Sequence, residues 1–122
     1  MSNMKQYTDK LAQLKFDKMY NGDFFLTWEK TRDELEAVFT VADALRYLRE
    51  NNISSKIFDS GLGISLFRDN STRTRFSFAS ACNMLGLEVQ DLDEGKSQIA
   101  HGETVRETAN MISFMADVIG IR

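Results

Sequence analysis

The sequence predicts an α/β fold, a parallel sheet with flanking helices, from three observations. Apolar segments that suit short strands occur at 63–67, 88–92 and 118–121. Between them, residues 72–85 and 103–116 repeat their apolar side chains at helical spacing. The alternation of strand and helix is typical of right-handed crossovers between parallel strands, and ligands bind such sheets at the carboxyl ends of the strands.

The first 50 residues precede this alternation and are expected to be partly helical. Residues 1–20 suit either a short helix or a loose arm. Residues 21–23 indicate a turn, and four apolar side chains after it must pack on another part of the protein: Phe24, Phe25, Leu26 and Trp28. Thr31 and Glu34 form a capping box that predicts a helix from Thr31, and the Asn-Asn pair at 51–52 ends it.

The later elements are bounded in the same way. Residues 56–58 and 63–67 flank a turn at 59–61, so either one strand or a strand pair with a turn is expected here. Gly86 stands where a glycine commonly ends a helix, and Cys82 lies on the apolar side of the helix before it. The second helix is expected to point four side chains inward: Val105, Ala109, Ile112 and Met115.

Composition limits the function classes. The 122 residues, 43% hydrophobic and 27% charged, give room for one core and one domain at most. A net charge of −3 argues against a nucleic-acid or anionic-membrane binder, since those need a basic surface. No long apolar run or leader pattern is visible, and the single Cys82 cannot form an internal disulfide, so a reducing, cytoplasmic location is expected.

The residues between the first strand and its helix predict an anion site. Residues 71–75 read Ser-Thr-Arg-Thr-Arg. The first-turn N–H groups of a helix have no backbone partner and sit at the positive end of its dipole, and arginine forks hold phosphate or carboxylate oxygens in pairs. Taken alone, the same residues would also suit a solvated helix start with a Ser or Thr cap.

A second polar segment, 97–104, separates the second strand from the second helix and holds Gln98 and His101. Taken alone it is a polar loop with a solvated histidine. His101 and Cys82 are a poor start for a metal site, and neither a dinucleotide nor a Walker-type glycine pattern occurs. No metal or organic cofactor is expected.

The string Ser-Thr-Arg-Thr-Arg after a strand ending in Phe67 resembles the carbamoyl-phosphate signature of the aspartate and ornithine carbamoyltransferase family. The resemblance spans about residues 24–122. It implies an amino-terminal arm at 1–23, the front part of the carbamoyl-phosphate-binding domain at 24–122, and an absent acceptor domain. A fragment of this kind is expected to expose apolar sheet edges, to be marginally stable and to be inactive alone.

The resemblance also implies an activity, transfer of the carbamoyl group of carbamoyl phosphate to the amine of an amino-acid-like acceptor with release of phosphate. Ser71, Thr72, Arg73 and Thr74 would hold the phosphate, and Arg73 would stabilise it as it leaves. Thr74 and Arg122 would polarise the carbonyl oxygen. Arg75 is expected to be structural, tying the signature to neighbouring carboxylates.

The 97–104 loop bears on the implied partner, which is another copy of the same chain. Ser97, Gln98 and His101 resemble the ornithine-type loop and residues 102–104 the aspartate-type continuation. In the family this loop enters the active site of a neighbouring subunit, where the residue matching Gln98 touches carbamoyl phosphate, so a homotrimer is implied.

The residues before the signature bear on the acceptor. Arg68 stands near a position where the family carries an acid, which would disfavour a cationic acceptor. Together with the mixed loop, it makes the chain most similar to the YgeW-type carbamoyltransferases. A phosphate- or carboxylate-binding module without transfer activity and an assembly remnant are the alternative functions.

Overall fold

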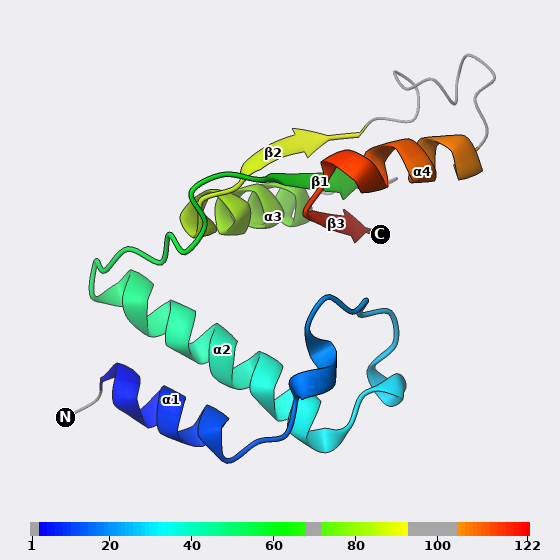
Figure 1. Cartoon of the computed structure of the whole chain (residues 1–122). Helices are drawn as coiled ribbons and strands as arrows, with labels where there is room; N and C mark the ends of the chain where they lie inside the picture. Colours follow the sequence, from blue (N-terminus) through cyan, green and yellow to red (C-terminus); the bar gives the residue numbers. More distant parts are fainter. Residues whose placement is uncertain (1–2, 68–71, 93–104) are drawn as a thin grey trace. The chain divides into compact units, whose positions relative to one another are not determined.

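The computed structural model describes residues 3–67, 72–92 and 105–122 of the chain, which divides into two compact units, Met1–Ser54 and Ser55–Arg122 (Figure 1). The predicted boundary between residues 23 and 24 is a different kind of division, based on family resemblance. Among the described residues, no helix combines the length and the apolar character needed to cross a membrane.

The first unit contains α1 (Met4–Ala12), two 3₁₀ turns, η1 (Asp17–Met19) and η2 (Thr27–Glu29), and α2 (Arg32–Glu50). The start of the chain is therefore helical rather than a loose arm, and the Asn3 side chain caps α1 by accepting from the Lys5 N–H at 2.9 Å. α1 packs on α2, where the rings of Tyr7 and Tyr47 lie 5.9 Å apart.

The limits of α2 confirm the capping prediction. The Glu34 N–H donates to Thr31 Oγ1 at 3.1 Å, and the Thr31 N–H donates to Glu34 Oε1 at 2.8 Å. At the other end, the Tyr47 carbonyl accepts from both the side-chain amide of Asn51, at 2.9 Å, and the Asn51 backbone N–H, at 3.1 Å, so Asn51 closes the last turn.

The apolar segment before α2 does not pack as expected. Its side chains are 40% to 79% exposed: Phe24, Phe25, Leu26 and Trp28. The segment is a single 3₁₀ turn with extended flanks, and the Lys30 ammonium lies 5.4 Å from the centre of the Phe24 ring.

The second unit is a parallel sheet with two helices, as predicted. Strand β1 (Leu62–Leu66) is central and pairs in parallel with β2 (Glu88–Asp91) on one side and β3 (Val118–Ile121) on the other. Helix α3 (Thr72–Leu85) packs on β1 and β2, whereas α4 (Val105–Met115) leads into β3.

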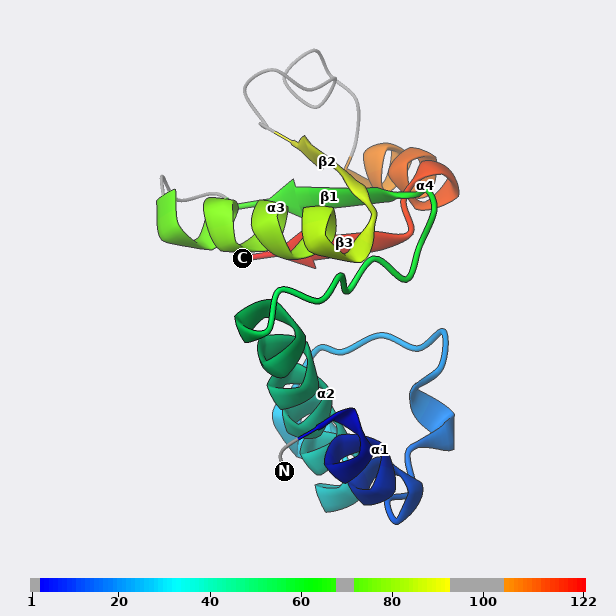
Figure 2. The same cartoon turned by 90° about the vertical axis from the view of Figure 1, so that its left-hand side faces the viewer.

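Glycines allow α3 to approach the sheet closely (Figure 2). A Cβ at Gly63 would lie 2.7 Å from the Cys82 sulfur, and one at Gly120 would lie 2.7 Å from the Phe78 ring. Phe78 in turn meets Phe67 edge-on with ring centroids 5.9 Å apart. Residues without side chains in β1 and β3 thus make room for the apolar face of α3.

Of the two alternatives for residues 56–67, the single strand is confirmed by β1 and the strand pair is wrong, because residues 56–58 form no strand. This segment lies beside the end of α3, where the Phe58 N–H donates to the Leu85 carbonyl at 3.0 Å and the nearby Ser55 hydroxyl donates to the Met84 carbonyl at 3.1 Å. It therefore serves the last carbonyls of a helix, which lack partners inside the helix, and not a sheet.

The predicted inward face of α4 is also wrong in part. Thr108 is buried and Ile112 half-buried, whereas Ala109 is exposed and Met115 is 57% exposed. The two more buried positions are therefore four residues apart. After the helix, the Asp117 carboxylate accepts from the Leu62 N–H at 2.8 Å. The side chain of Val105 lies outside the described part of the chain.

Gly86 ends α3 in a Schellman motif, because the Leu87 N–H donates to the Cys82 carbonyl and the Gly86 N–H to the Asn83 carbonyl. Gly86 has φ +100°, and a Cβ there would lie 1.9 Å from the Phe58 carbonyl oxygen. We expect Gly86→Ala to lower the free energy of unfolding by about 2–3 kcal/mol in urea titrations.

Gly22→Ala is the matched control, since a Cβ at Gly22 would lie no closer than 3.4 Å to its nearest neighbour. It should change the free energy of unfolding by less than about 0.5 kcal/mol. Equal effects in the two variants would contradict this account of the end of α3.

Candidate functional site

The carboxyl ends of the three strands lie at one edge of the sheet, and the predicted site residues follow them. β1 continues into Phe67, β2 ends at Asp91 and β3 is followed by Arg122. Backbone pairing extends to this edge: the Leu92 N–H donates to the Ser65 carbonyl at 2.8 Å, and the Arg122 N–H donates to the Leu66 carbonyl at 3.0 Å. The register therefore fixes where the residues beyond each strand begin.

Two of the predicted catalytic residues meet at this edge. Arg122 Nη1 donates to Thr74 Oγ1 at 2.8 Å, although the two residues are 48 positions apart in the chain. Thr74 lies in the first turn of α3 and is half-buried, and Arg122 is exposed. The fold thus brings the predicted pair together, and their roles in polarising a carbonyl oxygen stay predictions.

Thr72 and Arg73 begin α3 and are both exposed. The Arg73 side chain makes no hydrogen bond or ion pair with any described residue. The first turn of α3 contains no acidic residue, so its backbone N–H groups keep their preference for an anion. Several other predicted residues lie outside the described ranges: Arg68, Ser71, Ser97, Gln98 and His101.

Arg75 has the structural role that the sequence predicted. Its Nη1 pairs with Asp91 Oδ2 and its Nη2 donates to the Phe67 carbonyl at 2.7 Å. Sequence reasoning missed the acid that receives it, because Asp91 appeared there only as part of a strand. Its place at the carboxyl end of a parallel strand was the available signal.

No cluster of three or more His, Cys, Asp or Glu suited to a metal ion occurs in the described ranges. Cys82 is 4% exposed, and burial raises the pKa of its thiol. Its sulfur lies against the sheet under Gly63, away from the first turn of α3.

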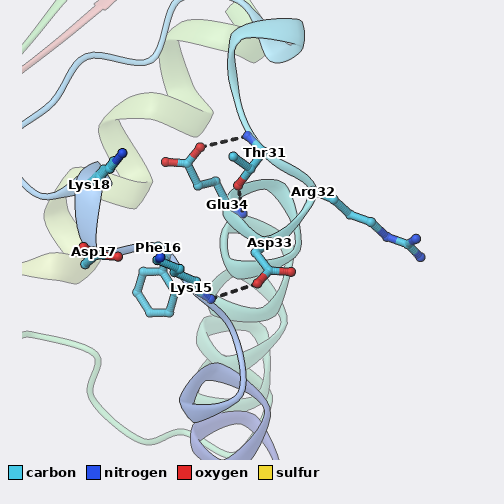
Figure 3. A pocket seen from close by; sticks show the side chains of 8 residues that line it. All are labelled: Lys15, Phe16, Asp17, Lys18, Thr31, Arg32, Asp33 and Glu34. Carbon is cyan, nitrogen blue, oxygen red and sulfur yellow. Dashed lines mark hydrogen bonds between the residues drawn. The ribbon is translucent and has the colours of Figure 1, made fainter.

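A pocket of about 410 Å³ lies elsewhere, in the first unit, between the start of α2 and residues 15–18 (Figure 3). Two of its three acids already have partners: Asp33 accepts from the Lys15 N–H at 3.0 Å, and Glu34 belongs to the capping box. Figure 3 shows Arg32 pointing away from the pocket. These contacts cap a helix and indicate no ligand.

The comparison with protein families decides the assignment. The model of the aspartate/ornithine carbamoyltransferase carbamoyl-P binding domain matches residues 23–122. The chain belongs to this family. The Ser-Thr-Arg-Thr-Arg string at the start of α3 and Arg122 at the end of β3 lie within the matched region.

Curated relatives agree with the family. "Putative carbamoyltransferase YgeW" of Escherichia coli (strain K12) is 74% identical over 104 residues, which cover 85% of this chain and 26% of the relative. Ornithine carbamoyltransferase of Prochlorococcus marinus subsp. pastoris is 34% identical over 89% of this chain and 34% of its own length. The chain therefore spans about a quarter to a third of these family members.

Solved structures show the same fold. The catalytic subunit of M. Jannaschii aspartate transcarbamoylase superposes with a TM-score of 0.71 at 29% identity, covering 81% of this chain and 33% of the other. Aspartate transcarbamoylase from Trypanosoma cruzi, in complex with carbamoyl aspartate and phosphate, gives a TM-score of 0.74 at 24% identity over 82% of this chain and 32% of the other.

The burial of Cys82 yields a test. At pH 8 we expect its thiol to react with a disulfide reagent at least about 100-fold more slowly in the folded chain than in the urea-unfolded chain, because the thiolate is the reactive form. The folded pKa lies above the unfolded value of about 8.5, so the stability that the neutral thiol contributes is lost as the pH rises beyond that value.

Cys82→Ala is the control for the pH profile, since it removes the titrating group and should flatten this part of the curve. A folded chain whose thiol reacts as fast as the unfolded one would contradict the assignment of Cys82 to the core.

Proposed function

We propose that the chain forms the carbamoyl-phosphate site of a carbamoyltransferase. The observation that carries the proposal is the hydrogen bond from Arg122 to Thr74, which joins the end of β3 to the first turn of α3. It unites the two residues that the family resemblance assigns to the carbonyl oxygen, beside the exposed Arg73.

The reaction needs positioning and charge stabilisation more than a protein nucleophile. The acceptor amine attacks the carbamoyl carbon, the new C–N bond forms, and negative charge grows on the carbonyl oxygen. The C–O bond to phosphate then breaks, the phosphate leaves with the bonding electrons, and the amine loses a proton. Donors aimed at the developing oxyanion and at the leaving phosphate lower this barrier.

Each residue has a distinct task in this scheme. The first-turn N–H groups of α3, the side chains of Ser71 and Thr72, and Arg73 hold the phosphate. Thr74 and Arg122 donate to the carbonyl oxygen. A guanidinium suits the leaving group because its planar fork binds two oxygens at once and keeps its charge.

The acceptor is proposed to be an amino-acid-like amine, as the names of the ornithine and aspartate relatives indicate for those proteins. Arg68 would disfavour a cationic acceptor. We further propose a homotrimer in which Ser97, Gln98 and His101 complete the site of a neighbouring subunit, and a cytoplasmic location in line with the single cysteine.

The domain proposal follows the family match, which begins at residue 23. Residues 24–122 form the front part of the carbamoyl-phosphate-binding domain and residues 1–23 an amino-terminal arm. The acceptor-binding part would belong to the remaining length of the family members. By this proposal the 122 residues bind the donor.

Donor binding is measured by titrating the chain with carbamoyl phosphate and following the amide signals of residues 72–75 by NMR. Arg73→Gln should weaken binding at least about tenfold, because a charge-assisted hydrogen bond to an anion is worth about 1.5–3 kcal/mol. Inorganic phosphate should bind the same residues, and the wild-type chain should prefer carbamoyl phosphate.

Arg49→Gln is the matched control, since Arg49 is another exposed arginine, in the last turn of α2, and it should bind like the wild type. Binding of phosphate without carbamoyl phosphate would identify a plain anion-binding module. No shifts at all in the folded wild-type chain would refute the donor site in this chain.

A further inference from the structure

We propose that Asp91 is a positioning residue of the donor site, which holds Arg75 so that Arg73 and Thr74 face the donor. The inference rests on the proposed function and deepens it. Four groups form what we call the Asp91 network: the hydroxyl of Ser65, the carbonyl of Phe67, the guanidinium of Arg75 and the carboxylate of Asp91.

The network joins three elements at the carboxyl edge of the sheet. Ser65 in β1 donates through its hydroxyl to Asp91 Oδ1 at 2.6 Å, and Arg75 in α3 pairs with Asp91 Oδ2 at the end of β2. The second Nη of Arg75 donates to the Phe67 carbonyl at 2.7 Å. Both carboxylate oxygens and both terminal guanidinium nitrogens are therefore engaged.

These contacts fix the two ends of the connection between β1 and α3. Phe67 is the residue that follows β1, and Arg75 lies in the first turn of α3. A single guanidinium bonded to the Phe67 carbonyl and held by Asp91 sets the distance between the two ends. The predicted phosphate-binding residues stand between them in the chain.

The Arg75–Asp91 pair is less exposed than the Lys5–Asp9 pair on the surface. The Ser65 residue is 2% exposed, and the side chains of Arg75 and Asp91 are 29% and 41% exposed. The Lys5–Asp9 pair, in contrast, has side chains 77% and 57% exposed. Exposed pairs of that kind contribute little, whereas a hydrogen-bonded fork at a half-buried site defines a geometry.

The arrangement gives the two arginines of the signature different tasks. Residues 73 and 75 lie about 200° apart around a helix, so their side chains leave it in nearly opposite directions. Asp91 holds Arg75 in the network and offsets its charge, while the Arg73 side chain makes no hydrogen bond or ion pair with a described residue. An anion at the helix start then contacts the guanidinium of Arg73 and not that of Arg75.

The test is a double-mutant cycle on carbamoyl phosphate binding. Asp91→Asn, which preserves shape and removes charge, should weaken binding about fivefold to tenfold, as outer residues that orient a binding group commonly do. Arg75→Gln should weaken binding by a similar factor, and the double variant should bind no more weakly than either single variant. Asp43→Asn, which breaks the exposed Asp43–Arg46 pair, is the control and should bind like the wild type.

A structural role alone would lower stability without redirecting Arg73. The Nε–H signal of Arg73 should shift on ligand addition in the wild type and stay unshifted in Asp91→Asn, while the amide signals of β1 and β3 stay in place. Asp91→Glu keeps the charge and should keep binding within about threefold of the wild type. Ser65→Ala, which leaves the ion pair intact, should weaken binding about twofold to threefold. It replaces Asp91→Asn as the test variant if Asp91→Asn does not fold.

Binding by Asp91→Asn within about twofold of the wild type, effects that multiply in the double variant, or a Ser65→Ala chain that binds like the wild type would overturn the inference. These outcomes leave the proposed function standing, because the wild type still binds. Absence of binding in the wild type itself would instead refute the proposed function.

Discussion

The parallel pairing of β1 with both of its neighbours is the constraint on which the rest of the second unit depends. It brings Phe67, Asp91 and Arg122 to one edge of the sheet, although they come from three separate parts of the chain. Register matters as much as direction. Ser65 stands opposite Asp91, and a slip of one residue would turn one of these side chains to the other face and break their hydrogen bond.

Helix α3 is held at both ends. The Arg75 guanidinium ties its first turn to the Phe67 carbonyl, and the Schellman motif at Gly86 together with the Phe58 N–H closes its last turn. Between these ends, Phe78 packs over Gly120. Larger residues in the sheet would lift the helix, and with it Thr74, away from the end of β3, where Arg122 now reaches it.

Local patterns in the sequence predicted the elements, and contacts between elements explain where prediction failed. The capping box at Thr31 and the glycine at position 86 are local signals, and both mark the helix ends correctly. The two alternative faces of α4 have the same helical spacing, and only packing in the sheet selects the one with Thr108. Asp91 was missed for a similar reason, since its partner Arg75 becomes a neighbour only when α3 is seated on the strands.

The overall charge of −3 bears on the proposed donor site. A protein with a net negative charge gains little from long-range attraction of an anion, so the proposed binding would depend on cations and N–H groups within a few ångströms. Two arginines two positions apart in the chain would repel each other if both were aimed at one ligand. Pairing Arg75 with Asp91 offsets one of the two charges and gives that arginine a structural role. The charge of Arg73, which no described acid offsets, then remains at the helix start, where the α3 dipole also favours a phosphate.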